Sequence, residues 1–208
     1  MAALKSWFPT QIYHAPLLRA PAPGARFRRE LERECHQYRE LDDAGRKWSK
    51  RNYPGGYTSY GSLDKLHRLG GGFADLERHL QRHARSFSRA LDWDLGQAGL
   101  VLTDCWINIM PHRTVHSLHL HPNSVISGTY YVATPRNCAG LKFEDPRLSR
   151  FMAAPPRGDA PRRENQAHIT YPAEAGTVIL FESWLRHEVP PNPVAAERIS
   201  VSFNFAWG

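Results

Sequence analysis

The 208-residue sequence predicts an α+β protein, mainly β, in which N-terminal helices flank an antiparallel sandwich or barrel. Apolar residues recur at helical spacing in the first half and alternate at strand spacing in the second half. No helical stretch separates the expected strands, so they should pair antiparallel. We therefore expect one structural domain, with a helical and loop region over residues 1–97 packed on a β core over residues 98–208.

The first half predicts two amphipathic helices joined by an ordered loop. Apolar residues recur at steps of three and four, as Phe27, Leu31, Cys35, Tyr38 and Leu41 in the first helix and Phe73, Leu76, Leu80, Phe87 and Leu91 in the second. This spacing places them on one face of each helix. Residues 45–71 between the helices are rich in Gly, Tyr, Ser and Asn, which predicts the loop.

The second half predicts seven short strands. Runs rich in Val, Ile, Thr, Tyr and Phe are separated by Pro, Gly and Asn, which is typical of strands and their turns. The strands are expected near 99–110, 115–121, 125–133, 140–144, 167–171, 176–182 and 197–206. The remaining segment, residues 148–165, is rich in Pro and Arg and predicts a mobile loop, a candidate lid over a site.

The composition narrows the function classes. The net charge is +7, but most arginines are interleaved with acidic residues, so a solvated basic surface is favoured over a nucleic-acid patch. An anionic substrate or an anionic carrier protein would also suit this surface. No run of about 18 apolar residues occurs, so no membrane span is expected. The cysteines Cys35, Cys105 and Cys138 are far apart, which favours a reducing, cytoplasmic location.

Histidines cluster in "VHSLHLHP", residues 115–122. Alternate side chains of a strand share a face, so His119 and His121 should project together. If the strand runs back unbroken, His116 lies on the opposite face. The pair could bind a metal, or the stretch could be a loop that is rich in imidazole. His187, which follows the apolar run "GTVILFESWL", is either a third ligand or a histidine of a surface loop.

The last predicted strand, "ERISVSFNFAW", has two different faces. One face carries Arg198, Ser200, Ser202 and Asn204, and the other carries Ile199, Val201, Phe203 and Phe205. We expect the apolar face to pack against the helices and the polar face to line a cavity. An arginine in such a cavity can bind a carboxylate bidentately. The first predicted strand shows the same pattern, with Asp104, Trp106, Asn108 and Met110 opposite Cys105, Ile107 and Ile109.

Three motifs in this order, "HLHPNSVISGTYYVATP", "GTVILFESWLRHEVPPN" and "RISVSFNFAW", resemble the Fe(II)/2-oxoglutarate-dependent oxygenases. Within them the chain is similar to a 2OG-Fe(II) oxygenase group of the prolyl-hydroxylase-like branch. "WFPTQIY" and "YTSYGSL" extend the resemblance over nearly the whole chain. It implies a double-stranded β-helix, a jelly roll or cupin-like barrel, with N-terminal flanking helices. It also implies an enzyme that uses Fe(II), 2-oxoglutarate and O2, usually to hydroxylate its substrate.

The resemblance assigns roles to individual residues. The metal ligands are His119, His121 and His187. Arg198 and Tyr131 match residues that hold the distal carboxylate of 2-oxoglutarate, and Ser202 and Asn108 match polar cosubstrate contacts. Trp106 and Trp184 are candidates for the substrate side of the pocket, with plain core packing as the alternative. The expected substrate is a small, amino-acid-derived or carrier-bound molecule, and neither nucleic acid nor a membrane is expected as a partner.

The chain departs from the family pattern at His121, where most members have Asp or Glu. Three-histidine sites occur in cupin-type dioxygenases that do not use 2-oxoglutarate, so such an enzyme is an alternative. A non-catalytic metal-binding or sugar-binding jelly roll is another. Glu144 and Asp145 could instead supply a ligand or support one. Arg198 favours 2-oxoglutarate.

Overall fold

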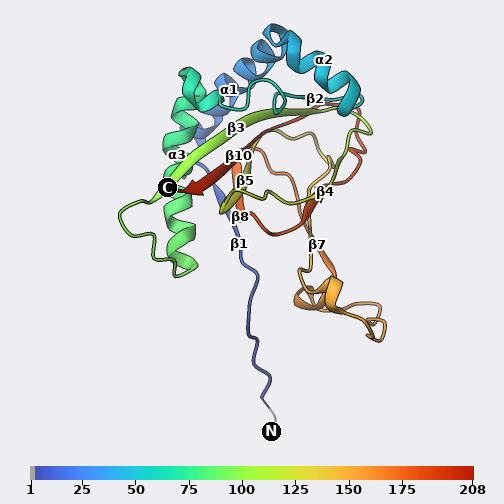
Figure 1. Ribbon diagram of the computed structural model, residues 1–208. Helices are drawn as coiled ribbons and strands as arrows, with labels where there is room; N and C mark the ends of the chain where they lie inside the picture. Colours follow the sequence, from blue (N-terminus) through green and yellow to red (C-terminus); the bar gives the residue numbers. More distant parts are fainter. Residues whose placement is uncertain (1–2) are drawn as a thin grey trace.

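Two antiparallel β-sheets face each other in the computed structural model, which describes residues 3–208 (Figure 1). The larger sheet has the order β1 (Ile12–Pro16), β8 (Thr177–Glu182), β5 (Ile126–Ala133), β10 (Arg198–Trp207), β3 (Leu100–Met110) and β2 (Tyr57–Thr58). The smaller sheet has the order β4 (His116–His119), β9 (His187–Val189), β6 (Leu141–Glu144) and β7 (His168–Tyr171). This is the predicted jelly roll, or double-stranded β-helix.

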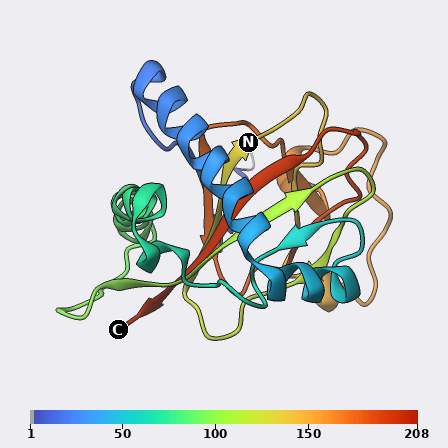
Figure 2. The ribbon, with the colours of Figure 1, turned by 90° about the horizontal axis from the view of Figure 1, so that it is seen from above.

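The helices lie on the outer side of the larger sheet. They are α1 (Pro21–Leu41), α2 (Asp43–Asn52) and α3 (Gly71–Ala90), with short 3-10 helices η1 (Leu66–Leu69), η2 (Leu148–Arg150) and η3 (Arg163–Asn165). Figure 2 shows α1 and α2 crossing over the sheet, with α3 beside them. No helix within residues 3–208 is long and apolar enough to cross a bilayer.

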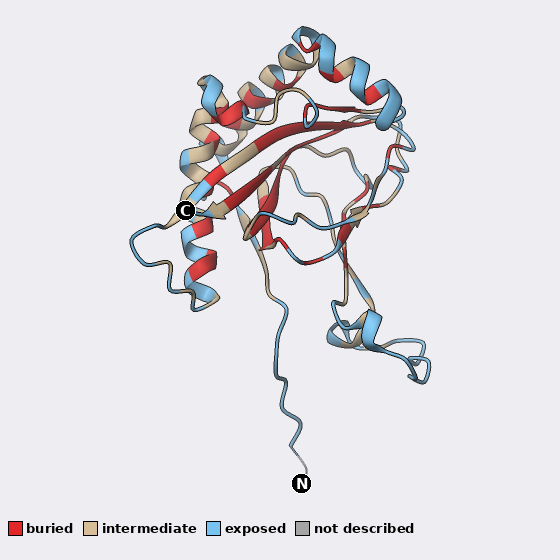
Figure 3. Ribbon diagram, in the orientation of Figure 1, coloured by how far each residue is buried: buried red, intermediate tan, exposed pale blue. Residues whose placement is uncertain are grey.

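The main hydrophobic core fills the space between these helices and the larger sheet. Its helix side includes Phe27, Leu31, Phe73, Leu76 and Leu80, and its strand side includes Ile107, Ile109, Val201, Phe203 and Phe205. Figure 3 shows this burial along the strands and on the inward sides of the helices. The predicted apolar faces of the first and last strands are therefore confirmed, and so are the predicted helix faces except at Leu41, which ends α1 and is 79% exposed.

A second, smaller core lies between the two sheets. It includes Met110, Tyr131, Phe143, Ile179 and Phe181, with Tyr53 from the N-terminal half. This cluster closes one end of the space between the sheets and leaves the rest of that space to polar side chains.

The structure also corrects the element boundaries. The loop expected over 45–71 is wrong at its start, because α2 runs to Asn52. The Asp42 carboxylate accepts a hydrogen bond from the Gly45 amide at 2.8 Å and caps this helix. Three short strands were not predicted: β1 and β2, which join the larger sheet from the N-terminal half, and β9, which carries His187.

Candidate metal and cosubstrate site

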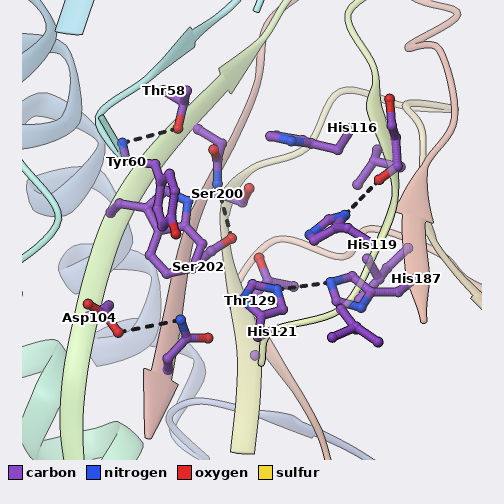
Figure 4. Close-up of a pocket in the computed structure, with 18 of the residues that line it drawn as sticks. Thr58, Tyr60, Asp104, His116, His119, His121, Thr129, His187, Ser200 and Ser202 are labelled. Atoms are coloured by element: carbon purple, nitrogen blue, oxygen red, sulfur yellow. Dashed lines mark hydrogen bonds between the residues drawn. The ribbon is translucent and has the colours of Figure 1, made fainter. Parts of the chain in front are cut away.

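The site is a cavity of about 760 Å³ between the two sheets. Its inner wall is formed by the polar faces of β3 and β10, which contribute Asp104, Trp106 and Asn108 and then Arg198, Ser200, Ser202 and Asn204. The predicted polar faces of these strands therefore do line a cavity. Figure 4 shows the histidines of the opposite wall facing Ser200 and Ser202.

Three imidazoles meet on the opposite wall. Nitrogen atoms of His119, His121 and His187 all lie within 4.8 Å of one another, the only such group of three or more His, Cys, Asp or Glu side chains in residues 3–208. His119 and His187 are cross-strand partners on β4 and β9, with ring centroids 4.4 Å apart. His121 follows β4, where its backbone N–H donates to the Ser183 carbonyl at 3.0 Å, and its Nε2 lies 3.3 Å from Nε2 of His187.

Backbone carbonyls orient two of these rings. Nδ1 of His119 lies 2.6 Å from the Ser117 oxygen, and Nδ1 of His187 lies 2.9 Å from the Leu185 oxygen. When Nδ1–H donates to a carbonyl, the lone pair of Nε2 is free to bind a metal. The two rings are thus held in the tautomer that a metal requires.

Burial favours the neutral form of His121 and His187. It lowers the pKa of His187 to about 3 and the pKa of His121 to about 4, and the neighbouring His119 lowers both further. A neutral imidazole is the form that binds a metal. These shifts suit a site that is ready to take up a cation at neutral pH.

His116 does not lie where unbroken strand alternation would put it. On β4 it pairs with Val189, whereas His119 pairs with His187, so β4 has one more residue than β9 over this stretch. Such a bulge shifts the alternation by one residue. His116 therefore lines the same cavity as His119, and it is not directed to the opposite face as the unbroken strand would predict.

Arg198 lies at the inner end of the cavity and is almost fully buried, with 1% of its surface exposed. Its Nη1 donates to the Met110 sulfur at 3.1 Å and to the Ser200 hydroxyl at 3.2 Å, and its guanidinium lies 4.9 Å from the centre of the Tyr131 ring. No Asp or Glu of the described residues forms an ion pair with it. A buried charge is costly unless it is paired, so this arginine calls for an anion.

Other polar atoms near Arg198 also lack partners. Arg198 Nε, the Tyr131 hydroxyl and the Asn108 side-chain oxygen are buried and make no hydrogen bond within the described chain. Asn108 Nδ2 donates to the Ser202 hydroxyl at 3.0 Å. Burial raises the pKa of the Tyr131 phenol, so this group stays protonated and can donate. Tyr131 lies behind Arg198 and is not itself among the residues that line the cavity.

Of the remaining predicted substrate-side elements, only Trp106 lines the cavity. Trp106 is buried and lines the cavity, with its ring centre 6.0 Å from that of His121. Trp184 is 47% exposed and lies outside the cavity lining, because Leu185 takes the buried position of that turn. Segment 148–165 contributes nothing to the lining and projects from the barrel (Figure 1).

The positions of Glu144 and Asp145 do not support a role for either carboxylate at the metal site. Glu144 pairs with Arg186 at 2.7 Å, and Asp145 pairs with Arg147 at 2.9 Å. Neither lines the cavity. Both carboxylates are already used by neighbouring cations, so the middle position of the cluster is held by His121.

The N-terminal half supplies cavity residues that the sequence patterns did not identify. Trp48 and Asn52 come from α2, and Tyr53, Thr58 and Tyr60 come from the turn and strand that follow. The only local signal was the density of tyrosine and glycine in "NYPGGYTSYGS".

The chemistry of these donors fits iron and a dicarboxylate. Three imidazoles with converging nitrogen atoms can hold a divalent first-row metal. A buried arginine without a counter-anion, beside an unpartnered phenol, suits the far carboxylate of a 2-oxo diacid. The three imidazoles and Arg198 line one cavity, and Tyr131 lies behind Arg198.

Comparison with known proteins agrees with this arrangement. Residues 104–204, from β3 to β10, match a family described as "Putative 2OG-Fe(II) oxygenase". No curated protein matches the sequence.

Solved structures share the fold at low sequence identity. A prolyl-4-hydroxylase from Pseudomonas putida is 15% identical with a TM-score of 0.58, over 95% of this chain and 92% of that one. HygX from Streptomyces hygroscopicus, crystallised with nickel, 2-oxoglutarate and hygromycin B, is 14% identical with a TM-score of 0.59, over 95% and 83%. AviO1 from Streptomyces viridochromogenes Tue57 is 18% identical with a TM-score of 0.59, over 95% and 90%.

Proposed function

Because the chain belongs to the 2OG-Fe(II) oxygenases, and so is an enzyme that uses Fe(II), 2-oxoglutarate and O2, we propose that it hydroxylates a small organic molecule. In the overall reaction one oxygen atom of O2 converts a C–H bond of the substrate to C–OH. The other oxygen atom enters succinate, which is formed from 2-oxoglutarate with release of CO2. Bound iron and 2-oxoglutarate supply this oxidising chemistry, and the protein supplies binding and orientation.

One observation carries the proposal. A single cavity holds a cluster of three imidazoles and a buried arginine without a counter-anion. A metal-binding jelly roll without 2-oxoglutarate has no need of the arginine, whose burial costs free energy. In this proposal His119, His121 and His187 hold the metal, and Arg198 with Tyr131 holds the far carboxylate of 2-oxoglutarate.

Asn108 and Ser202 support the cosubstrate in the same proposal. Their mutual hydrogen bond fixes the Asn108 amide and leaves its oxygen without a partner. That oxygen can accept a hydrogen bond from ordered water or from a bound group in the cavity.

The substrate should be a small molecule. A cavity of about 760 Å³ lies in the range of pockets that hold drug-sized ligands, so it has room beyond a five-carbon diacid. The HygX structure contains hygromycin B, and the epimerase SnoN comes from nogalamycin biosynthesis, so two proteins of this fold handle small molecules. Trp106 lines the part of the cavity beside His121 and is proposed to contact the substrate.

A turnover assay tests the proposal. Fe(II)-loaded protein supplied with 2-oxoglutarate, O2 and a metabolite extract should form succinate, together with a product heavier than its substrate by one oxygen atom. The Arg198→Gln variant should form little succinate under the same conditions. Absence of succinate from iron-loaded wild-type protein would overturn the use of 2-oxoglutarate. Product found only on a protein-bound thioester would place the substrate on a carrier.

A further inference from the structure

A fourth imidazole in the cavity, that of His116, is held by an aromatic partner from the N-terminal half. The rings of His116 and Tyr53 are stacked, with centroids 4.5 Å apart and an interplanar angle of 29°. The Tyr53 hydroxyl lies 2.8 Å from Nε2 of His116. The pair joins the turn after α2 to β4 across the cavity wall.

His116 stands apart from the metal cluster. Its Nε2 is occupied by Tyr53, and it does not belong to the group of imidazoles whose nitrogen atoms converge. It nevertheless lines the cavity in which that group lies (Figure 4). Its role must therefore concern what fills the cavity.

His116 lines the same cavity as both anchors of the cosubstrate, Arg198 and the imidazole cluster. Burial lowers the pKa of His116 to about 3, and the next causes are the charges of Arg198, His119 and His121. Arg198 also acts on the Tyr53 phenol, whose pKa burial raises. His116 also lies on β4, three residues before His119 of the imidazole cluster.

The hydrogen bond to Tyr53 fixes the proton of the ring. The Tyr53 hydroxyl has no other hydrogen-bond partner in the described structure, and its raised pKa keeps it protonated. Both groups are best satisfied when the phenol donates to Nε2, which leaves the imidazole proton on Nδ1. Nδ1 makes no hydrogen bond within residues 3–208, so its N–H remains available as a donor.

Backbone packing holds Tyr53 in place. A Cβ atom on Gly56 would lie 2.5 Å from the Tyr53 ring and 2.7 Å from the Thr114 methyl group, so only glycine allows this close approach. Tyr53 also ends α2, where its N–H donates to the Ser49 carbonyl. A ring fixed in this way can orient His116 without loss of side-chain entropy on ligand binding.

We propose that His116 lies beside the bound 2-oxo acid, where its Nδ1–H donates to a carboxylate oxygen and its ring limits the space for the carbon chain. Tyr53 positions His116, so this pair sets the length of the 2-oxo acid that the enzyme accepts. This inference rests on the proposed function. His116 is a specificity residue in it, and Tyr53 is a positioning residue that acts through His116.

The test compares two 2-oxo diacids that differ by one methylene group. Dissociation constants of 2-oxoglutarate and 2-oxoadipate are measured by calorimetry on Ni(II)-loaded protein. Wild-type protein should prefer 2-oxoglutarate. His116→Ala should weaken 2-oxoglutarate binding roughly tenfold, the scale of one hydrogen bond to a charged group, and should narrow or invert the preference because it opens space.

Two further variants separate size from hydrogen bonding. His116→Phe keeps the wall but loses the donor, so 2-oxoglutarate should bind more weakly while 2-oxoadipate gains nothing. Tyr53→Phe keeps the stacked ring and loses the hydroxyl, so its effect should have the same sign as that of His116→Ala on 2-oxoglutarate and be smaller. His112→Asn, at an exposed position, and Tyr38→Phe, in the outer core, are the matched controls and should leave both constants unchanged.

The outcomes are distinguishable. Ni(II) affinity within twofold of wild type in every variant is expected, and its loss in His116→Ala would show that His116 is a ligand and overturn the inference. An unchanged ratio of the two dissociation constants in His116→Ala and His116→Phe would overturn it as well. Failure of wild-type protein to bind 2-oxoglutarate would instead overturn the proposed function. Thermal unfolding of each variant shows whether it is folded.

Discussion

The two faces of β10 are both buried, but one carries apolar side chains and the other carries polar and charged side chains. Val201, Phe203 and Phe205 on the outer face are fully buried against helices, without a polar atom to satisfy. On the inner face Arg198 is as deeply buried, yet its Nε has no partner and its charge has no counter-anion. A single strand thus separates a face that stabilises the fold from a face that is incomplete without a ligand.

This difference separates residues that stabilise the folded protein from residues whose interactions are completed only when a ligand binds. Apolar burial on the outer face contributes to stability in every state of the protein. The unpartnered groups of the inner face lower the stability of the free protein and are satisfied only when an anion binds. Substitutions on the two faces of one strand should therefore have opposite effects on stability and on binding.

The largest effect on stability is expected from the outer face. Phe203→Ala removes a fully buried ring that lies against Phe205 and Gly128, and should lower the free energy of unfolding by about 3–5 kcal/mol. Chemical denaturation measures this loss. At low temperature, where the variant is still folded, its Ni(II) affinity should stay near that of wild type. A parallel loss of metal affinity would mean that the two faces are not independent.

Arg198→Gln should show the reverse behaviour. The affinity for 2-oxoglutarate should fall by about 100-fold, because the bidentate charge-assisted pair is lost, while stability should stay the same or rise by up to about 1 kcal/mol. Calorimetry and denaturation measure the two quantities. Arg85→Gln, on an exposed position of α3, serves as the control and should alter neither. A strong loss of stability in Arg198→Gln would contradict the idea that this charge is held for a ligand.

Acid should lower the free energy of unfolding of the metal-free protein, because it protonates buried histidines of the cavity. The pKa of His187 is lowered to about 3 and that of His121 to about 4, whereas in the unfolded chain a histidine titrates near 6.5. Their contribution to stability is therefore complete above pH 6.5 and is lost as the pH falls towards 4. We expect a decrease on the order of 1 kcal/mol per pH unit in this range.

Denaturation curves in the presence of a chelator between pH 7 and 4.5 measure this slope. His187→Gln should flatten it, whereas His112→Gln should not, because His112 is exposed. An equal slope in all three proteins would show that other groups cause the pH dependence.

The smallest effect is expected at Ser202. Its hydroxyl accepts the hydrogen bond from Asn108, and Ser202→Ala removes this support without removing the arginine. The affinity for 2-oxoglutarate should fall only about two- to fivefold, as expected for one neutral hydrogen bond. A loss of affinity as large as that of Arg198→Gln would show that Asn108 and Ser202 contribute as much to anion binding as Arg198 does.

The sequence patterns predicted long elements and their faces best. β3 and β10 are long enough for alternation to separate polar from apolar positions, and α1 and α3 are long enough for a helical period to be clear. β1, β2 and β9 are too short to carry a pattern, and they exist because a neighbouring strand accepts them. The pairing of His119 with His187 therefore depended on a strand that the sequence did not reveal.

The site was predictable in part for the same reason. The alternation of side chains along a strand correctly predicted that His119 and His121 lie together. The bulge in β4 depends on its pairing with β9, and it brings His116 to the same cavity. Tyr53 reaches that cavity from a segment 63 residues earlier in the chain, and no local pattern indicates such a contact. The turn that holds Trp184 turns its ring outward because Leu185 occupies the interior.

Titration of 2-oxoglutarate into Ni(II)-loaded protein tests the account most directly. Wild-type protein should bind one equivalent. Binding should be lost when the metal is removed and in His187→Ala, and it should weaken by about 100-fold in Arg198→Gln. His112→Asn should bind as wild type does. Binding that persists without metal, or that survives both His187→Ala and Arg198→Gln, would contradict the claim that the imidazole cluster and the buried arginine form one site.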